Sequence, residues 1–149
     1  MSLTETDRGE IRQLAGRYAH AIDAVAGGAW ADCFVPDGAF ESDLQGRFEG
    51  RAALIGFAET AGQWAREMAA QPRHWTNHWV IEGDGETATA VCYGMVIDTA
   101  HGGKLLAAGV YHDRLRKLKG EWRFVERVWT TDGPKDTEAL SGLTEAFTQ

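Results

Sequence analysis

The sequence predicts an α+β fold, a cone-like roll in which N-terminal helices pack on a curved, mainly antiparallel sheet. Two observations predict this class. Up to residue 70, apolar residues recur at intervals of three and four, as in amphipathic helices, and from residue 73 onward the period changes to two, as in strands. Glycine-containing turns then separate the later segments, as they do in sequential hairpins. Helices over the concave side of such a sheet leave a cone, which is a natural pocket.

Three helices are expected before residue 72. Thr4 or Thr6 can cap the first helix, and Gly27 ends it. One apolar stripe on a 3.6-residue period supports the first helix and another supports the third, which Pro72 ends. The expected helices span residues 5–26, 29–34 and about 51–70; a turn at 36–38 and a hairpin with strands at 39–42 and 46–49 lie between the second and the third.

Four longer strands are expected after the third helix. They are joined by tight turns, so they should form an antiparallel meander. The segment from Pro134 onward is polar with a weak helical pattern, and it is either a short final helix or a docking arm. We expect the whole chain, residues 1–149, to form one domain. The expected strands span residues 73–82, 86–99, 104–118 and 121–130.

The composition excludes several classes of function. The formal net charge of −7 argues against a surface that follows a nucleic-acid backbone. The basic run at 114–119 lies beside a hairpin turn and is better explained as a solvated strand face. No apolar run approaches the roughly 18 residues that a membrane span needs. The first residues lack the basic start and apolar core of a signal peptide, so we expect a cytoplasmic protein.

The sequence also predicts that the chain needs no metal and no organic cofactor. Cys33 and Cys92 are far apart and lie among apolar neighbours, which is typical of buried reduced thiols. No pair of histidines has the spacing of metal ligands. A glycine-rich phosphate loop after a strand and a nucleophile-elbow motif are both absent from the sequence.

The stretch 73–81 is the most promising place for proton chemistry. It carries two histidines, an asparagine and two tryptophans on one expected strand, and an imidazole titrates near neutrality. By strict alternation His74 and His78 share one face, with Trp75 and Asn77 on the other, unless a bulge resets the alternation. The pattern therefore leaves open whether His74 enters a pocket or is satisfied by a backbone carbonyl.

Asp23 is a second candidate, near the end of the first helix. At about 100° per residue it lies at the edge of the apolar stripe that contains Tyr18. Two interpretations remain on this pattern alone. The carboxylate is either solvated, or it lies at the mouth of the cone, where it could hold the tautomer of a histidine.

Several segments resemble SnoaL-like proteins of the nuclear transport factor 2-like superfamily. The resemblance covers nearly the whole chain up to about residue 130. It implies the cone-shaped fold predicted above, which hosts several chemistries as well as non-catalytic members. The segments are Tyr18–Asp23, Trp30–Glu41, Phe48–Leu54, His74–Asn77, Gly83–Ala88, Gly109–Leu115 and Gly120–Phe124 with Arg127.

Within this superfamily the pattern is most similar to scytalone dehydratase, bile-acid 7α-dehydratase and hexachlorocyclohexane dehydrochlorinase. These lyases pair an aspartate of the first helix with a histidine of the first long strand, which correspond to Asp23 and His74. Tyr18 is similar to an active-site tyrosine of the bile-acid enzyme, and Arg127 to a pocket arginine of some members. The chain lacks the second pocket histidine of scytalone dehydratase and the helix lysine of the dehydrochlorinase.

We therefore predict a cofactor-independent lyase or isomerase that acts on a small cyclic or aromatic hydrophobic molecule. His74 would remove a proton, Asp23 would orient the imidazole, and Tyr18 would donate a hydrogen bond to the leaving group or oxyanion. The alternative is a non-catalytic ligand-binding or oligomerising module, similar to the β subunits of ring-hydroxylating dioxygenases. A homodimer or homotrimer is expected in either case. The remaining candidate substrate-binding residues are Arg127, Trp30, Phe57, Trp75 or Trp79, Asn77, Met95 and Val110.

Overall fold

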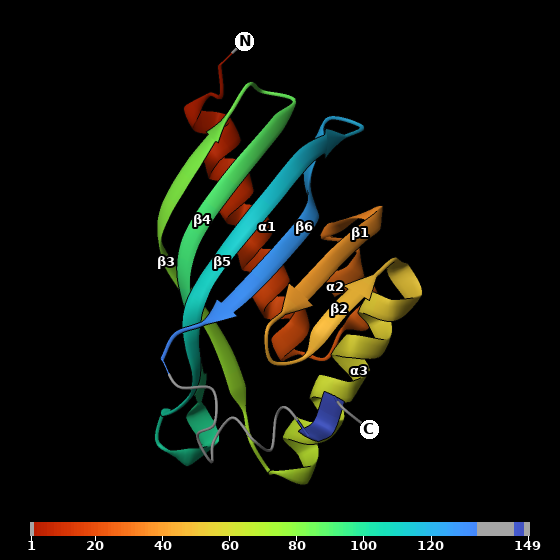
Figure 1. Cartoon of the computed structure of the whole chain (residues 1–149), viewed down its shortest axis with the longest axis vertical. Helices are drawn as coiled ribbons and strands as arrows, with labels where there is room; N and C mark the ends of the chain where they lie inside the picture. The colour runs from red at the N-terminus through yellow and green to blue at the C-terminus, as the bar shows by residue number, and fades with distance from the viewer. Residues whose placement is uncertain (1, 134–144, 148–149) are drawn as a thin grey trace.

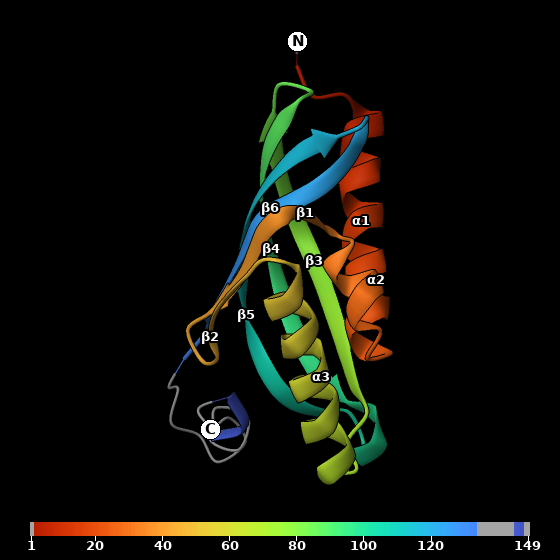
Figure 2. The ribbon, with the colours of Figure 1, turned by 90° about the vertical axis from the view of Figure 1, so that its right-hand side faces the viewer.

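A computed structural model describes residues 2–133 and 145–147, and in it the α-helices of residues 5–67 cover one face of a six-stranded sheet (Figures 1 and 2). The predicted α+β class is confirmed. The expected tail segment from Pro134 onward lies outside the described residues, except for 145–147. The elements are α1 (Glu5–Asp23), α2 (Gly27–Ala31), β1 (Phe34–Ser42), β2 (Gly46–Glu49), α3 (Arg51–Glu67), β3 (Pro72–Gly83), β4 (Thr87–Asp98), a short 3-10 helix (Thr99–His101), β5 (Lys104–Leu118) and β6 (Glu121–Thr131).

The sheet has the strand order β2-β1-β6-β5-β4-β3. Strands β3 to β6 form the predicted antiparallel meander. The sequence did not reveal that the β1–β2 hairpin joins the same sheet, with β1 parallel to β6. Periodicity shows that a segment is a strand, but it does not show which edge that strand pairs with.

The expected turn at 36–38 is an irregularity inside β1. Phe34 pairs with Phe124 and Ala39 with Glu126, so β1 places extra residues against β6 at this point. Gly38 permits the close approach, because a Cβ there would lie 2.9 Å from the Phe34 Cβ. The residues predicted to form a turn therefore form a bulge, and the strand continues beyond it.

Helix α1 ends three residues earlier than predicted. Thr4 caps its start in a capping box with Asp7. At the other end Val25 adopts a φ of 56°, and the N–H of Ala26 bonds the carbonyl of Ala21 at 2.9 Å. The side chain of Val25 then packs where a Cβ on Gly62 of α3 would be. The early stop makes Asp23 the last residue of α1.

The core lies between the helices and the concave face of the sheet, and it is rich in aromatic rings. Trp30 of α2 is fully buried and stacks on Phe57 of α3, with ring centroids 5.2 Å apart. The ring of Phe147 also stacks on Phe57, with ring centroids 4.9 Å apart, and it contacts the ring of Phe48. This aromatic cluster fixes α3 against the sheet, and α3 forms one wall of the cavity described next.

Candidate functional site

A β-bulge in β3 decides which side chains of this strand face the helices. The register with β4 shifts between Asn77 and Val80, and His78 adopts a φ of 54°. The bulge resets the alternation. His74 therefore points toward the helices, while His78 is exposed and Trp79 packs on the core. The expectation that the two histidines share a face is wrong for this reason.

His74 forms two hydrogen bonds with Asp23, and both residues are largely buried. The imidazole Nδ1 lies 2.6 Å from Asp23 Oδ1, and the backbone N–H of His74 donates to Oδ2 at 3.2 Å. The exposed fractions of the two side chains are 19% and 11%. A carboxylate at the C-terminal end of a helix faces the negative end of the helix dipole, so these two donors offset an unfavourable position.

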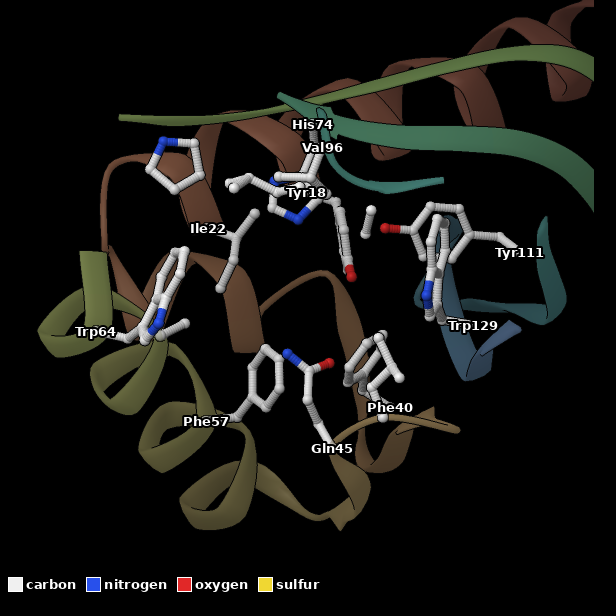
Figure 3. Close-up of a pocket in the computed structure, with 15 residues that line it drawn as sticks. Tyr18, Ile22, Phe40, Gln45, Phe57, Trp64, His74, Val96, Tyr111 and Trp129 are labelled. Carbon is white, nitrogen blue, oxygen red and sulfur yellow. The ribbon is translucent and has the colours of Figure 1, made fainter. Parts of the chain in front are cut away.

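This contact fixes the tautomer of His74. An ionised carboxylate only accepts hydrogen bonds, so Nδ1 carries the proton that it donates to Asp23. The other ring nitrogen, Nε2, is then unprotonated in the neutral imidazole and is free to accept a proton. The ring lies in the wall of a cavity beside Tyr18 and Val96 (Figure 3).

The cavity has a volume of about 90 Å³ and is mostly apolar. That is roughly six times the space that one water needs, so the cavity is larger than a site for a single water. Its polar groups are few, as in most small-molecule sites. Residues of α1, β1, α3, β3, β4, β5 and β6 line it: Tyr18, Ile22, Phe40, Leu44, Gln45, Phe57, Ala61, Trp64, Pro72, His74, Val96, Leu106, Ala107, Tyr111 and Trp129.

Two phenols, Tyr18 and Tyr111, point their hydroxyl groups into the centre of the cavity (Figure 3). Burial raises the pKa of Tyr18 well above its ordinary value, and the nearby Tyr111 adds to this increase. Burial also raises the pKa of Tyr111 to about 12, although Arg127 opposes the shift. Both phenols are thus protonated near neutral pH and can donate hydrogen bonds.

A buried ion pair lies behind these phenols. Arg127 is fully buried, and its guanidinium carbon is 3.7 Å from the ring centre of Tyr111 and 4.4 Å from that of Tyr18. Its Nε is 3.1 Å from Asp113 Oδ1, although the angles do not meet those of a hydrogen bond. Burial raises the pKa of Asp113 to about 6 against the attraction of Arg127.

Of the predicted site residues, Tyr18, Phe57 and His74 line the cavity, and Asp23 holds His74 from behind. The structure does not place Arg127 in the wall, because the two tyrosine rings separate it from the cavity. Trp30 lies one layer deeper, behind Phe57, where the aromatic core buries it completely.

Four predicted wall residues lie elsewhere. Trp75, Asn77 and Met95 line a shallow depression on the outer face of the sheet, together with Tyr93. Val110 pairs with Tyr93 in the β4–β5 ladder and belongs to the same face. The physical reason is the two-residue alternation of strands, which sends these side chains away from the helices once His74 faces them.

Sequence reasoning missed most of the other wall residues, Tyr111, Trp129 and Gln45 among them. Tyr111 and Trp129 had a signal, because Gly94 of β4 and Gly109 of β5 pair with each other and leave space beside them. A Cβ on Gly94 would lie 2.8 Å from the Tyr111 ring and 2.9 Å from that of Trp129, so these glycines make room for the rings. Gln45 lies in the β1–β2 turn, and no pattern in the sequence indicates that this turn reaches the cavity.

Within residues 2–133 and 145–147, no group of three or more histidine, cysteine or acidic side chains is arranged to hold a metal ion. None of the helices in this part of the chain is long and apolar enough to cross a membrane.

A SnoaL-like domain model matches residues 4–128 of the sequence. The chain belongs to the SnoaL-like family. No curated protein sequence matches it. Among solved structures, a protein of unknown function from Mycobacterium tuberculosis is 30% identical, with a TM-score of 0.79 and coverage of 98% of this chain and 92% of that one.

Two proteins of Novosphingobium aromaticivorans are also similar. An NTF2-like protein with a cystatin-like fold is 27% identical, with a TM-score of 0.77 and coverage of 91% and 88% of the two chains. A second protein, described as a candidate scytalone dehydratase, is 19% identical, with a TM-score of 0.73 and coverage of 86% and 85%. At this identity the second likeness shows the fold alone. The family supports a catalytic or ligand-binding role in general terms.

Proposed function

We propose that this SnoaL-like protein is a cofactor-independent lyase or isomerase, and that it removes a proton from a small, uncharged cyclic or aromatic molecule. The observation that carries the proposal is the hydrogen bond from His74 Nδ1 to Asp23 at the wall of an apolar cavity. It leaves Nε2 as a proton acceptor at that wall.

The reaction would begin when His74 Nε2 takes a proton from the carbon next to an activating carbonyl. The imidazole becomes a cation, and the carboxylate of Asp23 stabilises it at a distance of 2.6 Å. Negative charge develops on the substrate oxygen, where Tyr18 donates a hydrogen bond in a mostly apolar site. Either a leaving group then departs, or the proton returns at another carbon.

An exchange assay tests this step without knowledge of the natural substrate. A panel of small cyclic ketones is incubated with the protein in D2O, and NMR follows the loss of the protons next to the carbonyl. The wild-type protein should accelerate the exchange of at least one ketone. His74→Ala should reduce the enzymatic rate by 10²- to 10⁴-fold, the usual contribution of a positioned general base.

The chain offers a matched control. His101 Nδ1 also contacts a carboxylate, that of Asp98, at 2.5 Å, but this pair lies at the β4–β5 turn and not at the cavity. His101→Ala should leave the exchange rate unchanged. The proposal is wrong if the wild-type protein exchanges no ketone of the panel, or if the His74 and His101 variants behave alike.

A second function is favoured by the outer face of the sheet. Trp75 and Tyr93 are each 56% exposed there, and aromatic residues are enriched in protein interfaces. We infer that this face joins copies of the chain into a homodimer or homotrimer, which a sedimentation experiment would detect. Loss of the assembly in Trp75→Ser, with exchange activity retained, would separate this role from the cavity.

A further inference from the structure

Gln45 presents an unpaired amide to the cavity. Its backbone is held in the β1–β2 turn, where its N–H bonds the carbonyl of Ser42 and the Ser42 hydroxyl bonds the N–H of Leu44. Its side chain lies between Phe40 and Phe57 and points toward the centre of the cavity (Figure 3). Within the described part of the chain, no hydrogen bond satisfies this amide.

An amide in this position needs a partner once a ligand fills the cavity. Gln45 is only half-buried, so water can serve its donor and acceptor groups. A ligand that displaces this water must replace its hydrogen bonds, because an unsatisfied buried amide is unfavourable. The position of Gln45 therefore selects for a ligand that carries a polar atom at this end.

The opposite side of the cavity also offers neutral hydrogen-bonding groups. The hydroxyls of Tyr18 and Tyr111 face Gln45 across the central space, with His74 beside them (Figure 3). The nearest guanidinium, that of Arg127, is fully buried behind the two rings and neutralised by Asp113. A charged ligand would thus enter an apolar space without an exposed counter-ion.

We propose that Gln45 is a specificity-determining residue, and that the ligand is a small uncharged molecule with oxygen functions at two opposite ends. One oxygen would meet the tyrosine hydroxyls, and the other would meet the Gln45 amide. This inference rests on the cavity that the proposed function uses, but it does not require that His74 transfers a proton.

Two probes of nearly the same shape test it. Hydroquinone carries two opposite hydroxyl groups, and in 4-methylphenol a methyl group replaces one of them. Calorimetric titration gives the ratio of their dissociation constants for the wild-type protein and for Gln45→Met, which keeps the side-chain length but removes the amide. The preference for hydroquinone should fall by two- to tenfold in the variant, the range expected for one neutral hydrogen bond.

Gln13→Met is the matched control, since Gln13 lies exposed on α1 away from the cavity. It should leave the ratio unchanged. An unchanged ratio in Gln45→Met, or failure of both probes to bind the wild-type protein, would overturn the inference. His74→Ala separates the two proposals, because it should reduce the rate of proton exchange but keep the dependence of the binding ratio on Gln45.

Discussion

Replacing Arg127 alone is expected to destabilise the protein strongly, because it leaves a buried carboxyl group without its partner. The ion-pair distance is 3.1 Å, and both side chains are fully buried. At an effective dielectric constant of about 20, the attraction between the charges is about 5 kcal/mol. Burial still outweighs it, because the pKa of Asp113 is raised to about 6. We therefore expect Arg127→Met to lose about 3–5 kcal/mol of the free energy of unfolding at pH 8.

The loss should depend on pH with a definite sign. The folded protein holds the Asp113 proton more tightly than the unfolded chain, with a pKa of about 6 against 3.8. This group contributes its full stability below about pH 4, and the contribution is lost as the pH rises through 6. The difference corresponds to about 3 kcal/mol. Without Arg127, an ionised Asp113 would be buried without a partner, and protonation removes this cost. Arg127→Met should therefore be less destabilised at pH 5 than at pH 8.

Urea unfolding followed by tryptophan fluorescence measures these free energies. The double variant Arg127→Met, Asp113→Leu removes both charges and should be within about 1 kcal/mol of the wild-type protein at pH 8, or more stable. Arg114→Met is the control, since Arg114 is 61% exposed and its pair with Glu126 contributes less than about 1 kcal/mol. The reasoning is refuted if the Arg127 variant loses less than about 1 kcal/mol at pH 8, or if the double variant is as unstable as the single one.

Two further substitutions test the elements that position the site. Gly94→Ala should lower the free energy of unfolding by about 1–3 kcal/mol and weaken ligand binding, because its Cβ would displace the rings of Tyr111 and Trp129. Urea unfolding measures the first effect and calorimetric titration the second. Gly9→Ala in α1, where a Cβ meets nothing, should not destabilise the protein. Thr4→Ala should cost about 1 kcal/mol in thermal unfolding without affecting ligand binding, since it removes a helix cap remote from the cavity.

Periodicity predicted the elements well where burial repeats regularly. The stripe on α1 and the four long strands of the meander follow directly from the alternation of apolar residues. It failed where the backbone departs from regular geometry. The positive φ of Val25 ends α1 at Asp23, and the bulge at His78 turns Trp75 away from the cavity. Both departures depend on tertiary packing, which local sequence does not encode.

Two of the predicted site residues lie in contact, whereas most of the cavity wall was not predicted. Resemblance to a family brought Asp23 and His74 together, and the structure confirms that they are in contact. Their catalytic role stays a prediction. Tyr111 of β5 and Trp129 of β6 were missed, because these side chains reach the cavity only after the sheet curves. Gln45 required knowledge that the β1–β2 hairpin joins this sheet.

The central claim is that Asp23 holds the proton of His74 on Nδ1 and leaves Nε2 as a base facing the cavity. Long-range ¹H–¹⁵N NMR correlations of the histidine rings at pH 8 report the tautomer directly. The account predicts a protonated Nδ1 and a bare Nε2 for His74 in the wild-type protein, and a loss of this bias in Asp23→Asn. A His74 ring with its proton on Nε2, or a tautomer that Asp23→Asn does not change, would contradict it.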